Sequence, residues 1–430
     1  MSGIIGVLAL LALLALGIPI GVAMGFVGLA GLVLMLGMEP ALIKSGVILF
    51  ETASRYELGV LPLFLLMAHL CFAAGASRDF FDAAARMIGH RRGGLALASI
   101  LGCAGFGAIS GSSLATAATV GLVGLPEMRR RGYSDALATG AIAAGGTLGS
   151  LTPPSGALIV FGILAEQSIG KLFTAAIFPA ITQTLFYLLT IVIVCRWRPS
   201  VGPAMPRATW SERRSALLRV ADLAALIVLV LAGIGLGWFT PTEAASVGVV
   251  GALALCAWRR RFNWPALRDA LSDTLRTTGM LYVVIIGALI FSVFMNLTGL
   301  SEQIAGIMGS LSGGRITAVV TMAIILLLLG SVLDGLALML LTTPILLPII
   351  LKLGLSPIWF GIFLVRTMEI GFIHPPIGIN LYVIQGIARD VPLSRIFKGV
   401  LPFLASDFLH LALLIAFPAL SLALPEWLGT

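Results

Sequence analysis

Gly149-Ser-Leu-Thr-Pro-Pro-Ser-Gly156 and Gly371-Phe-Ile-His-Pro-Pro-Ile-Gly378 are one short segment written twice, 222 residues apart. The same offset, without a gap, carries Pro126 to Pro348, Gly132 to Gly354 and Ser134 to Ser356. The chain is therefore an internal duplication. If it lies in a membrane, helices that Gly and Pro interrupt at matched places in two halves point to a binding site near the middle of the bilayer.

The composition is that of a membrane protein. Mean hydropathy is +1.08, and 59% of the 430 residues are hydrophobic while 11% are charged, against about 25% charged in soluble domains. The net charge of +8 comes from basic residues in loops between apolar runs, which is the positive-inside pattern and predicts no nucleic-acid partner. The cysteines stand singly in apolar segments, which predicts neither disulfides nor a transition-metal site: Cys71, Cys103, Cys195 and Cys256.

Basic clusters orient the chain, because Lys and Arg near helix ends stay in the cytoplasm. They occur at 78–92, 129–131, 196–219, 259–276 and 389–398. The first residues lack a basic n-region and a cleavage site, so we expect a retained first span rather than a signal peptide. These clusters predict a multi-pass protein with both termini on the periplasmic side. The expected spans are at about 3–17, 19–37, 58–75, 136–164, 172–195, 220–237, 243–257, 277–295, 358–386 and 399–424.

Two uncharged segments are predicted to be re-entrant hairpins. Residues 93–126 have basic flanks and a Gly/Ser-rich turn, which must be buried in protein or line a wet cavity, so this hairpin enters from the cytoplasm. Its counterpart, 316–351, turns near Asp334 between flanks with few basic residues and enters from outside. Residues 39–57 and 258–276 are expected to be amphipathic helices on opposite membrane surfaces.

The expected architecture is an all-α polytopic membrane protein built as an inverted repeat, with five transmembrane helices and one re-entrant hairpin in each half. An odd number of spans per half gives the halves opposite orientations. Each half also has a discontinuous helix. The predicted units are a first repeat, 1–198 (hairpin about 93–126, broken helix about 136–164), a cytoplasmic linker, 199–219, and a second repeat, 220–430 (hairpin about 316–351, broken helix about 358–386).

Each hairpin tip is expected to face a broken helix. A Pro-Pro pair in mid-span removes backbone donors and frees carbonyl oxygens. Such oxygens, with Ser and Thr hydroxyls, suit Na⁺, because the sites offer neither the His/Cys set of zinc nor the carboxylates of calcium. A half-helix that starts at a break also points its positive end inward, where it attracts an anion such as a carboxylate.

Several polar residues near these breaks have two readings. Asp334 ligates sodium or caps a hairpin helix. Arg366 pairs with Glu369 on its own helix or meets the substrate carboxylate. His374 offers a backbone carbonyl to a cation, and the Asn380 amide suits either ion or substrate. The residues predicted to contact substrate are Ser112, Ser155, Asn380 and Arg366.

Two other classes of protein fit the sequence less well. A serine hydrolase would need more than Ser110 near glycines, because the spacing is not G-x-S-x-G and the topology places no His with an acid nearby. The chain is therefore not expected to be an enzyme. A channel is disfavoured because hairpins from opposite faces suit alternating access better than a continuous pore.

Taken together, the motifs resemble the large membrane subunit of tripartite ATP-independent periplasmic (TRAP) transporters, the DctM type, over essentially the whole chain. The segments that carry the resemblance are Gly17-Ile-Pro-Ile20, Ala108-Ile-Ser-Gly-Ser-Ser113, Gly145 to Gly156, Phe239-Thr-Pro-Thr-Glu-Ala-Ala245, Leu333-Asp334 and Pro375-Pro-Ile-Gly-Ile-Asn380.

The resemblance implies sodium-coupled secondary active uptake of a small organic carboxylate across the bacterial inner membrane by an elevator mechanism. It implies two partners, a small four-helix membrane subunit (DctQ type) and a periplasmic solute-binding protein (DctP type). The family's sodium sites map onto Ser110, Ser113, Gly149 and Thr152 in one half and Asp334, Gly371 and His374 in the other. His374 departs from the Thr that the family commonly has before the proline pair.

The alternative is a stand-alone ion-coupled anion carrier of similar architecture that needs no binding protein. The residues leave open whether sodium or protons drive transport, and they do not identify the carboxylate.

Overall fold

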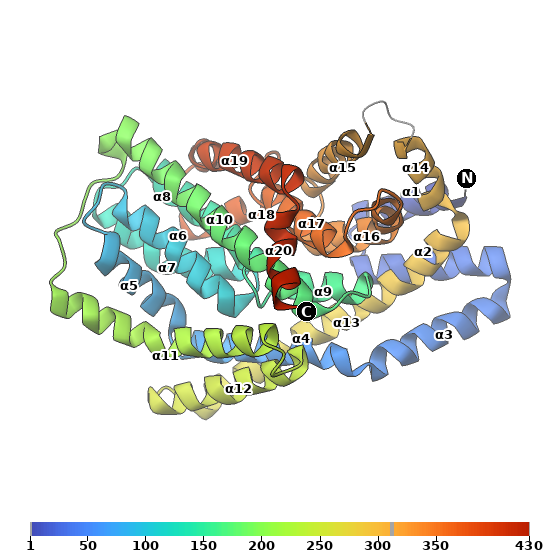
Figure 1. Cartoon of the computed structure of the whole chain (residues 1–430), viewed down its shortest axis with the longest axis horizontal. Helices are drawn as coiled ribbons and strands as arrows, with labels where there is room; N and C mark the ends of the chain where they lie inside the picture. The colour runs from blue at the N-terminus through green and yellow to red at the C-terminus, as the bar shows by residue number, and fades with distance from the viewer. Residues whose placement is uncertain (1, 310–313, 430) are drawn as a thin grey trace.

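The computed structural model describes residues 2–309 and 314–429, and every regular element in them is a helix (Figure 1). The first half contains α1 (Ser2–Ala15), α2 (Ile20–Leu36), α3 (Met38–Ser54), the 3₁₀ turn η1 (Tyr56–Gly59), α4 (Val60–Ala73), α5 (Ala76–Ile88), α6 (Gly94–Ser110), α7 (Ser113–Arg130), α8 (Asp135–Leu151), α9 (Gly156–Leu164) and α10 (Ile169–Trp197).

The second half repeats this order almost helix by helix. It contains α11 (Trp210–Gly235), α12 (Pro241–Trp258), α13 (Trp264–Thr298), α14 (Leu300–Gly309), α15 (Gly314–Gly330), α16 (Gly335–Lys352), α17 (Pro357–Gly371), α18 (Ile379–Ile387), α19 (Leu393–Ala416) and α20 (Ala419–Leu428). At the offset of 222, α7 falls on α16, α8 on α17, α9 on α18 and α10 on α19. Both predicted hairpins are present, as α6–α7 and α15–α16, and both broken helices, as α8–α9 and α17–α18.

The helices form two groups that meet at the middle of the molecule. α2, α3, α4, α12 and α13 pack mainly on one another. The hairpins pack on the broken helices, and α10 and α19 pack on the broken helices in turn. Figure 1 shows α3, α4, α12 and α13 along one long side and α8, α10, α17 and α19 along the other. We call the first group the scaffold and the second the core.

The two halves interlock rather than stand apart. α7 of the first half packs on α18 of the second, α16 packs on α9, and α2 crosses α13 as α4 crosses α12. At the α2–α13 crossing, a Cβ on Gly287 would lie 2.0 Å from the carbonyl oxygen of Gly21. Small residues let membrane helices approach this closely, so the backbones themselves form the contact between the halves.

The polytopic, all-helical architecture predicted from the sequence is confirmed. Among the described residues, seven helices are long and apolar enough to cross a membrane, and α8 with α9 forms a further span bent by 41°. α1 and α2 lie where two more spans were predicted, and have 14 and 17 residues.

The amphipathic helix predicted for 258–276 is not a separate element, which corrects the sequence interpretation. Residues 264–298 form one continuous helix of 35 residues, whereas the equivalent part of the first half breaks at Arg55 and η1. Pro62 explains the difference, because proline clashes with the carbonyl of the residue four earlier and is tolerated only in a helix's first turn. Its counterpart, Val284, lets the helix continue.

The linker between the halves is shorter than predicted, because α11 starts at Trp210. Thr209 and Glu212 form a capping box there, a signal that the sequence contained. The remaining linker crosses the base of the first hairpin. Its backbone bonds there are Met205 N to Gly89 O (2.9 Å), Gly93 N to Gly202 O (2.8 Å) and Ser134 N to Val201 O (3.0 Å).

Candidate functional site

The first hairpin turns through residues that favour an abrupt reversal. α6 ends at Ser110, and Gly111 follows with φ 59°, a left-handed conformation that glycine adopts without strain. Ser112 is the N-cap of α7, and its hydroxyl accepts a hydrogen bond from Ala115 N at 3.4 Å. The reversal therefore places the start of α7 at the hairpin tip.

Hydroxyl groups converge at this tip. Ser110 Oγ lies 2.7 Å from Thr116 Oγ1, and the backbone N–H of Ser113 donates to Ser150 Oγ at 3.2 Å. Ser150 comes from the broken helix, so the two elements share one polar cluster. Thr116 and Ser150 were not predicted, although Ser150 belongs to the duplicated segment and Thr116 lies one turn after Ser112.

The first break connects α8 to α9 in the protein interior. Ser155 caps α9 and also donates to Ser150 O, while Gly156 N donates to Gly111 O at 3.3 Å. Pro153, Pro154 and Ser155 are buried. The Thr152 hydroxyl oxygen is shut off from solvent and has no hydrogen-bond partner. A buried hydroxyl of this kind lacks the hydrogen-bond partner or cation that such groups usually have.

Gly149 allows the broken helix to touch the hairpin. A Cβ at this position would lie 2.5 Å from both Ser112 O and Thr116 Oγ1. The equivalent Gly371 has the same relation to the second hairpin, where a Cβ would lie 2.6 Å from Gly330 O. These close contacts explain why glycine is needed at both positions, and the explanation does not involve a bound ligand.

The second tip and break are open and have fewer hydroxyls. Asp334 is the N-cap residue of α16 but its side chain makes no capping hydrogen bond. Pro375, Pro376 and Ile377 are exposed. His374 contacts the ring of Phe408, with centroids 6.2 Å apart. The second break thus faces out of the protein, in contrast to the first.

Asn380 joins the second break to the first hairpin. Its side chain is fully buried, and its amide donates to Ser113 Oγ at 2.9 Å and to Ala143 O at 3.2 Å. Its carbonyl oxygen has no partner. The residue therefore links the two halves at the site, and the sequence could not show this because Ser113 lies 267 residues away.

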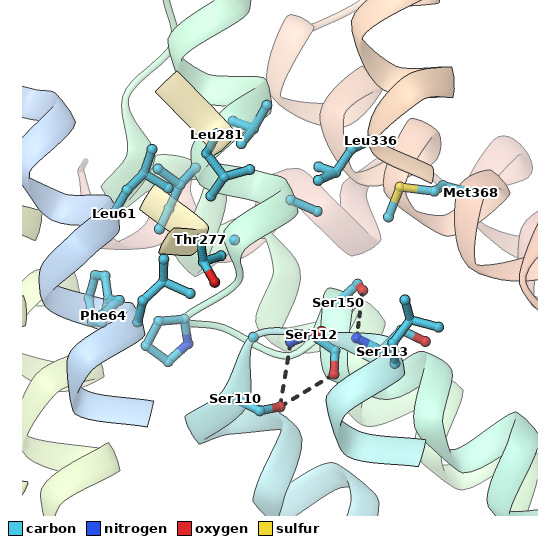
Figure 2. Close-up of a pocket in the computed structure, with 18 of the residues that line it drawn as sticks. Leu61, Phe64, Ser110, Ser112, Ser113, Ser150, Thr277, Leu281, Leu336 and Met368 are labelled. Atoms are coloured by element: carbon cyan, nitrogen blue, oxygen red, sulfur yellow. Dashed lines mark hydrogen bonds between the residues drawn. The ribbon is translucent and has the colours of Figure 1, made fainter. Parts of the chain in front are cut away.

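A cavity of about 210 Å³ lies between the two hairpin tips, the two broken helices and the scaffold. Figure 2 shows Ser110, Ser112, Ser113 and Ser150 together on one side of it, with Leu61, Phe64, Leu281, Leu336 and Met368 around the other sides. Leu61 and Phe64 come from α4, and Thr277 and Leu281 from α13. The scaffold thus supplies a mostly apolar wall opposite the polar tips.

The charge distribution of the cavity is unusual for an anion site. Asp334 is the one charged residue among those that line it. Three helices begin at the cavity, since its lining includes Ser113 of α7, Gly156 of α9 and Leu336 of α16. Their N-terminal ends carry partial positive charge. Positive potential therefore comes from backbone dipoles rather than from Lys or Arg.

Arg366 is not among the residues that line the cavity, and its contact with substrate stays a prediction. It is fully buried and donates to Glu369 Oε2 at 3.1 Å, Asp407 Oδ1 at 2.5 Å and His410 Nδ1 at 3.2 Å. Gln183 also donates to Asp407 Oδ1, at 2.7 Å. The intrahelical pair with Glu369 was one of the two predicted readings. Asp407, His410 and Gln183 lie far away in sequence and could not be assigned to this network from it.

The predicted residues divide into those that line the cavity and those behind it. Ser110, Ser112, Ser113 and Asp334 line it. Gly149, Thr152, Ser155, Gly371, His374 and Asn380 belong to the surrounding breaks and are not among its lining residues. Their assignments to sodium or substrate stay predictions. Groups of three or more His, Cys, Asp and Glu that could hold a metal ion do not occur in the described residues.

Two hairpins, two broken helices and a shared central cavity define a membrane permease of the inverted-repeat class. The family described as tripartite ATP-independent periplasmic transporter, DctM component, matches residues 7–420. The chain belongs to this family and is a TRAP transporter large permease subunit.

Relatives support the same assignment, and a solved structure shares the fold. The chain is 37% identical over 404 residues to the C4-dicarboxylate TRAP transporter large permease protein DctM of Pseudomonas aeruginosa, covering 94% of each chain. It is 31% identical to the sialic acid TRAP transporter large permease protein SiaM of Vibrio cholerae, covering 97% of this chain and 96% of that one. The Alcanivorax borkumensis YdaH transporter shares the fold, with a TM-score of 0.64, 15% identity and 89% of each chain covered.

Proposed function

We propose that the protein is the large permease subunit of a sodium-coupled TRAP system that takes up a small organic carboxylate through the central cavity. The observation that carries this proposal is the convergence of three helix N-termini on a cavity whose lining contains one carboxylate and no cationic side chain. An organic anion and a cation can occupy such a cavity together more favourably than either can alone.

Electrostatics gives the reason for coupling. A carboxylate substrate near Asp334 would be repelled by a like charge in a region of low dielectric constant. A bound cation removes that repulsion and adds its own attraction for the substrate. The helix N-termini then stabilise the substrate carboxylate. A positively charged side chain is not needed for this, and such a side chain would repel the bound cation.

The residues present fit a sodium ion. Ser110, Ser113, Gly149 and Thr152 would hold one ion in the first half, and Asp334, Gly371 and His374 would hold another in the second. With backbone carbonyls these residues offer oxygen ligands suited to a hard cation. The unpartnered Thr152 hydroxyl oxygen supports this assignment. Ser110 and Ser113 line the cavity beside Ser112, so ion and substrate sites adjoin.

Two relatives support a carboxylate as the class of substrate, whereas a third is named for isethionate, whose acid group is a sulfonate. One is named for C4-dicarboxylates and another for sialic acid, and both substrates carry carboxylates. The cavity's apolar wall, with Leu61, Phe64 and Leu281, would accommodate the carbon skeleton while the hydroxyl-rich tip contacts polar groups.

Membership of the family supports two partners, a small four-helix membrane subunit and a periplasmic binding protein that delivers the solute. The division into scaffold and core supports an elevator mechanism, in which the core moves with its hairpins and broken helices as one unit. The cavity at the border of the two groups is where such movement would change access.

Uptake into proteoliposomes tests the proposal. The chain is reconstituted with a small subunit and a binding protein, and labelled carboxylates are supplied with an inward sodium gradient, with a potassium gradient of equal strength, or with a proton gradient. We expect uptake in the sodium arm only. Equal uptake in the potassium arm would refute coupling, uptake in the proton arm alone would replace sodium with protons, and full uptake without the binding protein would favour the stand-alone carrier.

A further inference from the structure

A second polar site lies at the base of the first hairpin, away from the central cavity. The loop between α5 and α6, the interhalf linker and the start of α11 meet there. They bring together four basic side chains, those of His90, Arg91, Arg207 and Arg213. Of these four, only Arg207 lines a neighbouring pocket of about 400 Å³. Its other walls come from α5, α7 and the start of α11 and include the carboxylates of Asp82, Glu127 and Glu212, each paired with an arginine.

Arg213 is the unusual member of this group. Its Nε and Nη2 atoms are shut off from solvent and have no hydrogen-bond partner. Other arginines between α5 and α11 are satisfied, since Arg86 donates to Glu212 at 2.8 Å and Arg219 to Asp82 at 2.7 Å. Two buried guanidinium donors without an acceptor are costly, and a bound anion would remove that cost.

The surroundings favour an anion. The pKa of His90 is held below its ordinary value, first by loss of hydration and then by the positive charges of Arg213, Arg207 and Arg91. The charged groups that shift this pKa are therefore all arginines. Arg207 is, in the described residues, the one arginine of the adjoining pocket without an ion pair.

We propose that this cluster binds a phosphate group, with Arg213 as the main ligand and Arg207 as a second. A guanidinium presents adjacent N–H donors that match two phosphate oxygens, and charge-assisted bonds of this kind are strong. Basic pockets between helices at the membrane surface suit the phosphates of anionic lipid headgroups. Trp197 and Trp210, at the ends of α10 and α11, are strongly exposed, as expected for residues at the level of the headgroups.

Calorimetry on the full-length chain in detergent tests this site. The probes are dioctanoyl phosphatidylglycerol, dioctanoyl phosphatidylcholine and inorganic phosphate. We expect the anionic lipid to bind and Arg213→Gln to weaken it about tenfold or more, because one charge-assisted pair is lost. Arg207→Gln, at an exposed position that folding does not depend on, should weaken it several-fold. Competition by inorganic phosphate would identify a free phosphate as the ligand, and no competition would identify the lipid.

Arg214→Gln is the matched control, because Arg214 is the exposed neighbour of Arg213 on the same helix. It should change the affinity by less than about twofold if the site is specific. Equal weakening by Arg214→Gln and Arg213→Gln would show only a general attraction to a basic surface and would overturn the proposal. Equal affinity of the wild type and Arg207→Gln, or no binding of any probe, would also overturn it.

Discussion

The two hairpin tips occupy equivalent places but differ in chemistry and in exposure. Ser112 and Asp334 are the equivalent N-cap residues of α7 and α16, so a hydroxyl in one half corresponds to a carboxylate in the other. The first break is buried, whereas Pro375 and Pro376 of the second are exposed. The shared Gly and Pro residues fix the backbone of both sites, and the side chains around them determine what each site can bind.

The buried charge network sharpens this comparison most, because all of its charged members come from the second half, while Gln183 of the first half contributes a neutral hydrogen bond. Arg366, Glu369 and Asp407 correspond to Ala144, Thr147 and Leu185. Arg366→Leu would leave two carboxylates buried without their cation, and we expect it to lower the free energy of unfolding by about 3–5 kcal/mol. Thermal unfolding in detergent, followed by folded yield on size exclusion, measures the effect.

The control for that experiment is Thr147→Val in the first half. It removes the hydrogen bonds of Thr147 Oγ1 with Ala144 O, 2.7 Å long, and with Tyr187 Oη, 3.0 Å long, and should cost about 1–2 kcal/mol. If Arg366→Leu and Thr147→Val lower the free energy of unfolding equally, the buried charges contribute no more to stability than neutral hydrogen bonds do.

Asp334→Asn tests the difference between the tips directly. The change keeps the shape of the side chain but removes the charge, so sodium should bind about tenfold or more weakly if the carboxylate is a ligand. Sodium titration of uptake and of thermal stability measures it. If Asp334→Asn binds sodium as tightly as the wild type, Asp334 is not a sodium ligand and is only the residue that precedes α16.

Gly149→Ala tests whether close approach at the first break is required. Its Cβ would meet the Ser112 carbonyl and the Thr116 hydroxyl, so we expect a loss of about 1–3 kcal/mol of stability together with reduced uptake. Gly25→Ala in α2 is the control, because its Cβ would have no contact closer than 3.6 Å. Wild-type stability of Gly149→Ala would contradict the packing described for this break.

Ser113→Ala should have a smaller effect. It removes the acceptor of the Asn380 amide and one predicted sodium ligand, while the hairpin keeps its caps. We expect membrane insertion to be normal and sodium affinity to fall by about fivefold. If the sodium dependence of uptake is unchanged, Ser113 serves the contact between the halves rather than the ion.

The smallest effect is expected far from both tips, at Asp390. Its carboxylate accepts hydrogen bonds from Arg129, which hold the pKa of Asp390 below its ordinary value. The lowered pKa means that the stabilisation is present above the unfolded-state pKa of about 3.9 and is lost as pH falls through the folded value. The difference in melting temperature between wild type and Asp390→Asn should be small at pH 7 and vanish near pH 3. A difference that grows on acidification would contradict this assignment.

The sequence predicted the backbone of the fold better than its contacts. Gly, Pro and charge patterns located both hairpins, both breaks and the duplication, because these residues act through local backbone geometry. The partners of Asn380 and Arg366 escaped prediction, since they depend on how distant helices pack. The cavity wall on α4 and α13 escaped for the same reason, because apolar residues in a membrane helix do not reveal which of its faces meets a cavity.

The unbroken α13 has a mechanical consequence for the molecule. Its 35 residues, at about 1.5 Å each, make a rod of about 52 Å, longer than the roughly 30 Å hydrocarbon thickness of a bilayer. The equivalent arm, α3 with α4, is jointed at Arg55 and Tyr56–Gly59. α3 and α4 can therefore change their relative angle at these few residues, whereas α13 has no break at which its two ends could bend apart.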